Sequence, residues 1–498
     1  MEQRRRKTAS IVGILLPAGC AALLLCLAHL RPEDATGRFA VGMEAYLACC
    51  LAGALLLRGE KPERRYGSLA LLLGMAYLFL VTPLAVPDEG HHYRMALTLS
   101  NYLLGKGADA QTVPAALLRT AGFVRHKCVS SGYLRVMGEL FAPLPEGKTA
   151  STELAAGGYI LFYLPQTLGV TLGRLLGAGM VGTFLLGRLG NLLFYSACVF
   201  LAVRRAPCHK TVLGVTALLP MALQQAASFS YDAFTNGAAL LFLAELFYAM
   251  YGRGRLTRRD LARLILAGML LAPAKAAYVT MLPLLILAPA ERFGAAKEKR
   301  RSVAALLLTS AAFLACVYLP GLLTRTPADP DALNWESGHN YTMAFVLAHP
   351  GETAKIFALS FLNRLPSWAC TCVGEILGGT SLFLPLWIPA ALLGIAWLSA
   401  RDPEVSLDGR TRAAFLLTAI GTALLYLITM FFTWTSDDRT IIQGVQGRYF
   451  LPVFPLAMIA LRFPLGRKKI DLRRFFPPVM AGANALCLWM LLQYTLQH

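Results

Sequence analysis

The acidic and histidine residues that begin at Pro87 form the densest group of side chains able to move a proton. Asp88 and Glu89 are adjacent, and His91 and His92 follow directly. Carboxylate and imidazole side chains serve as general bases in catalysis. The run therefore predicts a general-base site, with Asp88 and Glu89 as the candidate catalytic residues and the two histidines as substrate contacts.

Two other interpretations of this run stay open. Asp88 and Glu89 could simply lie at the N-terminus of a helix, where negative charge is favourable. A divalent metal is a further alternative, because Asp88 and His92 are four residues apart and would share one helical face. Such a site would need more ligands from elsewhere, so we expect no metal and leave the cofactor undecided.

Asp232 and Lys275 are a second carboxylate and a cation at the ends of apolar runs. Asp232 follows Ser230 and Tyr231 in a pattern that also suits a helix N-cap. Lys275 comes just after Pro273, at a break between two apolar runs. A lysine at such a break is suited to a phosphate or carboxylate, although it could also extend to the membrane surface. We expect Asp232 to contact substrate and Lys275 to hold a lipid phosphate.

Arg448 lies in a polar run that enters another apolar segment. Its guanidinium group can donate two parallel hydrogen bonds to a phosphate, and Gly447 beside it permits a close approach. Gln446 and Tyr449 flank the pair and are candidate substrate contacts. Arg364 is a weaker candidate for the lipid phosphate.

The composition assigns these residues to a membrane protein. Of 498 residues, 56% are hydrophobic and 15% are charged, and the mean hydropathy is +0.54. A soluble domain carries about a quarter charged residues. Runs of about 18 apolar residues can cross the bilayer as helices. We expect an all-α polytopic fold with about thirteen spans, near 10–30, 39–57, 68–86, 181–203, 211–228, 235–252, 261–274, 276–290, 302–323, 380–400, 413–434, 448–463 and 475–495.

The positive charge follows the positive-inside pattern. The net charge is +19, and the excess of basic residues falls in short loops on one side of the expected spans. This places the N-terminus in the cytoplasm and the candidate residues outside, with the first apolar run as a retained anchor. The lipid bilayer thus accounts for the basic charge, and we expect no nucleic-acid partner.

Two long segments are expected outside the membrane, at 87–180 and 324–379. Their apolar stretches 156–173 and 353–378 would reverse the positive-inside pattern if they crossed, so we expect interfacial helices. The resulting organisation has N-terminal extra spans in 1–67, a membrane core in 68–465, and a basic loop with a last span in 466–498.

These features resemble the GT-C superfamily of polytopic glycosyltransferases, which use polyprenyl-phosphate sugars. An acidic pair opens the first large outside loop, the stretch from Tyr159 to Gly177 is similar to that loop's juxtamembrane helix, and Arg188 begins the next span.

Within that superfamily the chain is most similar to a bacterial family defined as a domain of unknown function. That family's signatures are Pro-Asp-Glu-x-x-His, Ser-Tyr-Asp and Gln-x-Arg-Tyr. The matching residues are Pro87–His92, Ser230–Asp232 and Gln446–Tyr449, and the similarity covers about 68–460.

The resemblance implies a glycosyltransferase of the bacterial plasma (inner) membrane. Asp88 would be the base, with Glu89 positioning it or substituting for it. Lys275 and Arg448 would hold the polyprenyl phosphate as it leaves with inversion at the sugar. The acceptor would be a hydroxyl of a cell-envelope glycan or lipid on the outer face.

Two other functions remain as alternatives. A transporter or flippase of a lipid-linked or anionic substrate would need polar residues near the bilayer midplane. A noncatalytic envelope-assembly protein would tolerate the loss of Asp88. Because the polar motifs gather at one surface, the transferase is the favoured prediction.

Overall fold

A computed structural model covers the whole chain, and its described part excludes the expected span 10–30. The described residues are 35–106, 112–114, 149–151, 158–323, 339–378, 382–401, 405–462 and 473–497.

Within these ranges the protein is a bundle of helices. Six helices are long and apolar enough to cross a membrane. The chain is thus a predicted membrane protein, as expected, but thirteen spans are not confirmed. The six are α2 (Ala35–Leu56), α8 (Met180–Arg205), α11 (Asp232–Tyr251), α13 (Ala296–Leu323), α17 (Gly409–Thr433) and α19 (Phe476–Gln497).

Several expected spans are shorter or interrupted helices. The run 211–228 is divided into α9 (Lys210–Ala217) and α10 (Pro220–Ala226), because Pro220 has no N–H to continue the first helix. The run 276–290 is the 3-10 helix η6 (Ala276–Leu287), which contains Pro283. Hydropathy detects such a run but does not show whether its helix is continuous.

The remaining elements complete the bundle and its outer segments. The helices are α3 (Pro62–Leu80), α4 (Glu89–Leu103), α7 (Leu164–Leu175), α12 (Arg258–Leu271), α14 (Met343–Ala348), α15 (Pro350–Val373), α16 (Trp387–Ser399) and α18 (Phe454–Ala460). Short 3-10 helices are η2 (Leu57–Gly59), η5 (Gly158–Tyr163), η7 (Ala290–Phe293) and η8 (Gly447–Phe450). Two antiparallel pairs join β1 (Thr112–Pro114) to β2 (Thr149–Ser151) and β3 (Ile376–Leu377) to β4 (Leu382–Phe383).

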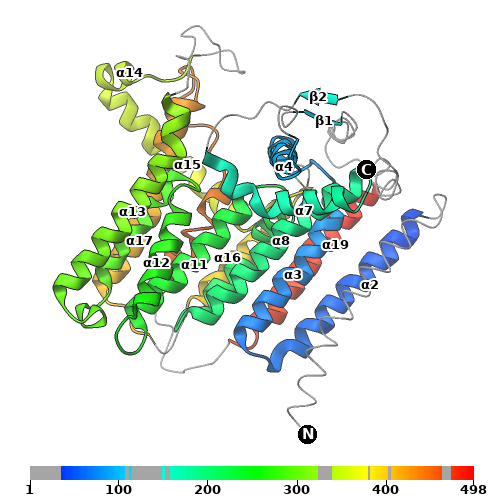
Figure 1. Cartoon of the computed structure of the whole chain (residues 1–498), viewed down its shortest axis with the longest axis horizontal. Coiled ribbons are helices and arrows are strands. Elements are labelled where there is room, and N and C mark those ends of the chain that lie inside the picture. The colour runs from blue at the N-terminus through cyan, green and yellow to red at the C-terminus, as the bar shows by residue number, and fades with distance from the viewer. Residues whose placement is uncertain are drawn as a thin grey trace.

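The bundle helices pack in a chain of neighbours. Helices α2, α3 and α19 contact one another, α8 packs between α3 and α11, and α12 connects α11 to α13 (Figure 1). Asn484 of α19 ties this core together, since its Nδ2 donates to the carbonyl of Leu218 and its Oδ1 accepts from the hydroxyl of Tyr77.

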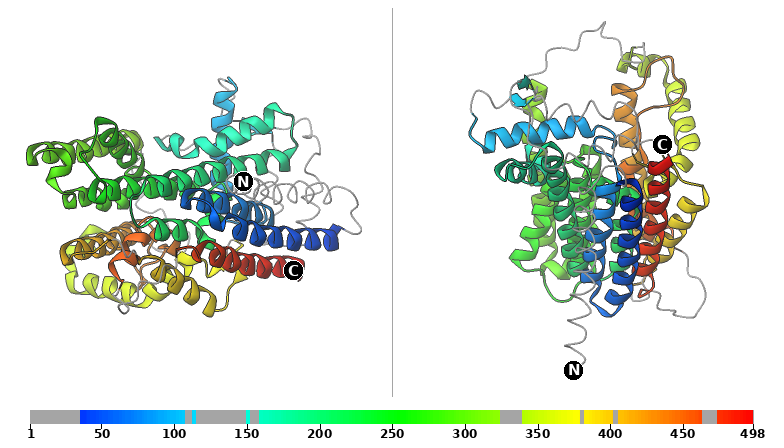
Figure 2. Two further views of the ribbon diagram at one scale, coloured as in Figure 1. Left: turned by 90° about the horizontal axis from the view of Figure 1, so that it is seen from below. Right: turned by 90° about the vertical axis from the view of Figure 1, so that its right-hand side faces the viewer.

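Helices α4 and α7, from the part of the chain between α3 and α8, lie across one end of the bundle (Figures 1 and 2). Helix α7 exposes Leu164, Leu168 and Leu172 at a four-residue spacing. On its other side, a side chain at Gly169 would overlap the carbonyl of Leu186 in α8, so only glycine permits this approach. An apolar stripe on a helix that crosses the bundle end fits the expected interfacial helix at 156–173.

Helix α15, between α14 and α16, continues through Pro366 as one helix. Ile356 and Trp368 of α15 belong to one apolar cluster with Leu427 and Phe431 of α17. Helix α15 is thus anchored against the bundle, and its last turns contact η8.

Candidate functional site

Glu89 and Arg188 form an ion pair from which the solvent is excluded. Both carboxylate oxygens of Glu89 accept hydrogen bonds from Arg188, at 2.8 Å from Nε and 2.7 Å from Nη2, and both side chains are fully buried. The backbone N–H of Phe229 donates to the same carboxylate at 3.1 Å. A buried charge must be paired and hydrogen-bonded to be tolerated, and here each charge is compensated by the other.

Arg188 also closes the end of α3. Its guanidinium donates to the carbonyls of Leu78, Val81 and Thr82, which lie in or just after the last turn of that helix. Since the last carbonyls of a helix have no partner within it, a buried helix end needs such donors. The pair therefore joins α3, α8 and the start of α4.

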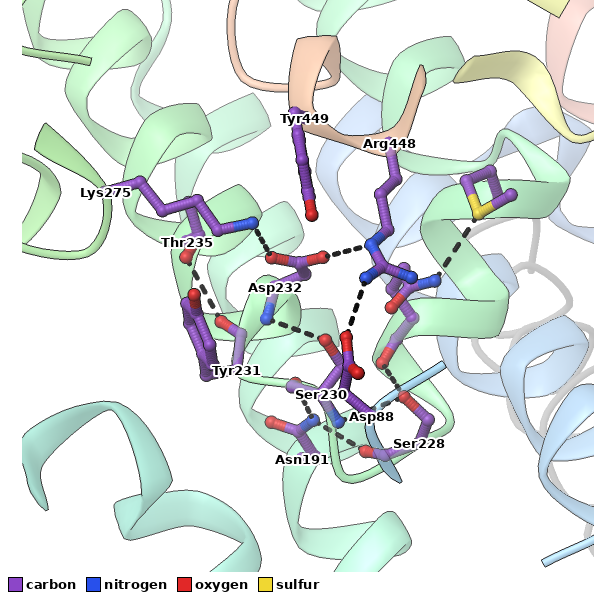
Figure 3. Close-up of polar contacts among 12 residues, drawn as sticks. Asp88, Asn191, Ser228, Ser230, Tyr231, Asp232, Thr235, Lys275, Arg448 and Tyr449 are labelled. Atoms are coloured by element: carbon purple, nitrogen blue, oxygen red, sulfur yellow. Dashed lines mark hydrogen bonds and ion pairs between the residues drawn. The ribbon is translucent and has the colours of Figure 1, made fainter. Parts of the chain in front are cut away.

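The loop Ser228–Ser230 is held by side chains from three helices. Gln166 of α7 donates to the carbonyl of Phe229 at 3.1 Å, and Asn191 of α8 donates to the carbonyls of Ser228 and Ser230. The third is Glu89 of α4. This loop leads directly into α11, so these side chains fix where Asp232 begins that helix. Figure 3 shows the contacts of Asn191 with this loop.

Asp232 bridges two cations in the centre of the candidate site. One carboxylate oxygen lies 2.6 Å from Nζ of Lys275, and the other lies 3.1 Å from Nε of Arg448 (Figure 3). Lys275 precedes η6, at the predicted break, and Arg448 lies in η8. Asp232 is buried and contacts both cations, and the alternative interpretation as a helix N-cap is wrong, because Tyr231 occupies that position.

Aromatic rings cover the lysine. Nζ of Lys275 lies 4.0 Å from the centroid of the Tyr449 ring and 5.3 Å from that of Tyr231. A cation over an aromatic face is stabilised by the ring's negative face. Tyr449 also stacks on Tyr426 with centroids 5.0 Å apart, so its ring is held in place.

Asp88 faces this cluster from the other side. It has a left-handed backbone (φ 63°), makes no capping hydrogen bond to α4, and lies 3.4 Å from Nη2 of Arg448. Its side chain remains 65% exposed. Asp88 occupies the N-cap position of α4 and Glu89 its first turn, so the alternative placement at a helix N-terminus agrees with the structure, although Asp88 makes no capping hydrogen bond. The two neighbouring carboxylates differ in their exposure, because the side chain of Asp88 is open to solvent and that of Glu89 is fully buried.

His92 is buried beside the cluster, whereas His91 is exposed. Nδ1 of His92 lies 2.7 Å from the hydroxyl of Tyr163, and its ring packs on that of Tyr231. Burial lowers the pKa of His92 to about 3, so the ring is neutral at neutral pH. Among the described residues no group of three or more His, Cys, Asp or Glu side chains is placed to hold a metal ion.

A cavity of about 490 Å³ adjoins Asp88 and Arg448. It lies between α10, α15 and the segment that leads into η8. The expected residues Arg364, Gln446 and Arg448 line it, and so does Pro87 beside Asp88. Gly447 lets η8 approach α15, because a side chain there would overlap the backbone around Trp368 and Cys372. The glycine therefore serves packing as well as access.

The structure thus brings together Asp88, Asp232, Lys275, Arg448 and Tyr449. Arg364 and Gln446 reach the same region through the cavity, while Glu89 lies in the buried pair. Most residues that line the cavity were absent from the predicted site, and two of them could contact a ligand. Gln225 is buried with its Oε1 unpaired among the described residues, and Trp368 is an aromatic wall. In the sequence, the pair Gln224 and Gln225 before the Ser-Tyr-Asp motif was the only signal for Gln225.

The buried pair gives a stability prediction. We expect Arg188→Met to lower the free energy of unfolding by about 3–5 kcal/mol, because it leaves the carboxylate of Glu89 buried without a cation. The double variant Glu89→Leu with Arg188→Met removes both charges and should recover part of this loss. Thermal unfolding of the purified proteins in detergent measures both. A double variant no more stable than Arg188→Met would contradict the assignment.

His92 gives a prediction for pH. Its folded pKa of about 3 lies below the value of about 6.5 in an unfolded chain, so between these values the unfolded state binds the extra proton. This contribution lowers stability as the pH falls below about 6.5, by about 2 kcal/mol at pH 5. The fall in melting temperature from pH 7 to pH 5 should be smaller in His92→Gln than in the wild type. The exposed His91→Gln is the control and should retain the full fall.

Comparison with known proteins places the chain in a family. A family model described as "Predicted membrane protein (DUF2142)" matches residues 71–457, from within α3 to within α18. No curated protein and no solved structure matches the chain. The matched range agrees with the expected 68–460 and contains every residue of the candidate site. The chain therefore belongs to the DUF2142 family of predicted membrane proteins.

Proposed function

We propose that this protein is an inverting glycosyltransferase that moves a sugar from a polyprenyl-phosphate donor to a hydroxyl of a cell-envelope acceptor. The observation that carries the proposal is the position of Asp88. An exposed carboxylate lies 3.4 Å from a buried arginine, beside a cavity that holds a second arginine. The resemblance of the sequence motifs to GT-C enzymes supports the same reaction.

Asp88 would act as the general base. Its carboxylate accepts the proton of the acceptor hydroxyl while the hydroxyl oxygen bonds to the anomeric carbon. The bond from that carbon to the phosphate oxygen breaks, and its electron pair leaves with the polyprenyl phosphate. Attack from the side opposite the phosphate inverts the configuration. General-base catalysis of this kind contributes about 10²–10⁴-fold to a rate.

Arg448 and Arg364 would stabilise the departing phosphate. Both line the cavity, and a guanidinium group matches the geometry of phosphate oxygens. Lys275 supports them indirectly, because it neutralises Asp232 at 2.6 Å. Without Lys275 the charge of Asp232 would be compensated by Arg448 alone. Lys275 would therefore belong to the phosphate subsite indirectly: its contact with Asp232 leaves more of the positive charge of Arg448 for the phosphate.

Neutral polar groups would orient the sugar and the acceptor. Gln446 and Gln225 line the cavity and can hydrogen-bond hydroxyl groups, and Trp368 offers a ring face to a sugar. Tyr449, which follows Arg448, and the exposed His91 would be further substrate contacts. His92 and Asp232 are buried beside them, so their contribution is to hold Tyr231 and the two cations in position.

Glu89 would position Asp88 rather than replace it. Its carboxylate is fully buried and accepts from Arg188 and Phe229, so it has no access to an acceptor hydroxyl. It fixes the start of α4, and Asp88 is the residue just before that helix.

The location follows from the arrangement of charge. The candidate site lies at the end of the bundle covered by α4 and α7, and the basic loops that start α12 and α13 lie at the other end (Figure 1). By the positive-inside rule the basic end is cytoplasmic. The site then faces outward from a bacterial plasma membrane, where lipid-linked donors and envelope acceptors meet.

Replacement of the base tests the reaction. We expect Asp88→Asn to reduce release of polyprenyl phosphate from labelled polyprenyl-phosphate sugars by about 10²–10⁴-fold, since asparagine cannot accept the proton. The matched control is Asp437→Asn, an exposed aspartate after α17, which should retain activity. Thermal unfolding confirms that both variants are folded. Full activity in Asp88→Asn, or no turnover of any donor by the wild type, would contradict the proposal.

Removal of the second arginine tests the phosphate subsite. Arg364→Gln should weaken donor binding about tenfold through the loss of one charge-assisted contact, which raises KM more than it lowers kcat. Lys355→Gln, at an exposed site on the same helix but away from the cavity, is the control. Equal effects of the two changes would exclude a specific role for Arg364.

A further inference from the structure

A second cavity lies at the opposite end of the bundle and takes no part in the proposed reaction. It has a volume of about 690 Å³ and lies between α8, α11 and α12. Helix α11 packs against both of the other helices and forms its floor. Four residues of α11 line it at positions i, i+3, i+4 and i+7, which is one face of a helix. They are Leu241, Ala244, Glu245 and Tyr248.

One end of this groove is positively charged. Arg204, Arg205 and Arg263 line it against a single carboxylate, Glu245. Arg205 is already committed, because it lies 2.9 Å from Glu245 and 2.6 Å from Asp260, and its guanidinium stacks over Tyr248. This network holds the rim of the groove in place, and Arg205 neutralises the carboxylates of Glu245 and Asp260.

The positive charges of Arg204 and Arg263 are largely uncompensated. Arg204 is exposed and makes no ion pair among the described residues. Arg263 is 57% exposed and lies only loosely against Asp260, at 3.7 Å. The rim therefore carries uncompensated positive charge beside a rigid ion-pair network.

The other end of the groove is apolar and open. Leu201 and Leu266 are exposed, and Leu241 and Leu270 continue the lining. From Tyr248 to Leu241 the floor descends seven residues, which at 1.5 Å per residue is about 10 Å along the helix axis. The charged end of the groove is thus separated from its leucines by about the distance from a phospholipid's phosphate, across its glycerol, to the first methylene groups of its acyl chains.

We infer that this groove binds an anionic phospholipid of the surrounding bilayer. Arg204 and Arg263 contact the phosphate and headgroup, and one acyl chain lies along Leu201, Leu241 and Leu266. A free phosphate would use the rim alone and leave the leucines exposed. Ordinary snorkelling of arginines at the membrane surface would require neither the groove nor its fixed rim. The charge pattern predicts this end to be cytoplasmic, where anionic headgroups attract basic residues.

This inference is independent of the glycosyltransferase proposal. Glu245 lies thirteen residues along α11 from Asp232, about 20 Å at 1.5 Å per residue. No residue lines both cavities. The test below measures lipid binding only, so its result does not depend on any activity.

The experiment compares lipid binding by two charge-reversed variants. Full-length protein in a neutral detergent is titrated with dioctanoyl phosphatidylglycerol, and bound lipid is followed by native mass spectrometry. We expect Arg204→Glu with Arg263→Glu to weaken binding by at least about thirtyfold. The matched control is Lys297→Glu with Arg300→Glu, which reverses two exposed cations of α13 outside the groove and should leave binding unchanged. Thermal unfolding checks that each variant is folded.

A third variant and two further probes separate the alternatives. Leu266→Gln changes an exposed apolar contact and should weaken phosphatidylglycerol binding without loss of charge. Dioctanoyl phosphatidylcholine should bind more weakly than phosphatidylglycerol to the wild type. Equal loss in both charge-reversed variants would show general attraction to the basic surface and overturn the inference. Displacement of phosphatidylglycerol by equimolar inorganic phosphate, or unchanged binding in every variant, would also overturn it.

Discussion

The ion pair between Glu89 and Arg188 is the constraint on which the end of the bundle covered by α4 and α7 depends. The two charges are buried and are stable there only as a pair, and their pairing holds α4 against α8. The remaining donors of Arg188 satisfy the end of α3, and Glu89 also receives the backbone N–H of Phe229. Loss of either partner would leave the other charge buried and unpaired, which is strongly destabilising, so the packing of α3, α4 and α8 depends on the pair.

The candidate site follows from that pairing. With Glu89 turned inward, the preceding residue adopts a left-handed backbone and directs its carboxylate outward to Arg448. With Phe229 held, the loop after α10 delivers Asp232 to Lys275 and Arg448. A fixed negative charge between two cations holds η6 and η8 together beside the cavity. Buried ion pairs therefore fix the positions of the side chains in the candidate site.

Both ends of α11 carry a carboxylate between cations, but the surroundings differ. At the end covered by α4 and α7, Asp232 pairs with Lys275, whose Nζ lies over the Tyr449 ring, and the adjoining cavity is lined in part by glutamine and arginine side chains. At the other end Glu245 lines a groove that also contains leucines. Similar ion pairs thus border two cavities with different linings. Which ligand each could hold depends on the neighbouring helices rather than on the charges.

The sequence alone predicted the membrane class and the similarity to a family defined as a domain of unknown function, and it named candidate residues such as Asp88, Asp232 and Arg448 that lie close together in the structure. These follow from composition, periodicity and local motifs, all of which are short-range properties of the chain. It did not determine that Pro220 divides one expected span or that another is a 3-10 helix, because an apolar run has the same hydropathy in each case. Nor did it distinguish Asp88 from Glu89, or include Gln225 and Trp368 in the site. Those outcomes depend on contacts between residues distant in the chain, such as Glu89 with Arg188, and only the tertiary structure brings such side chains together.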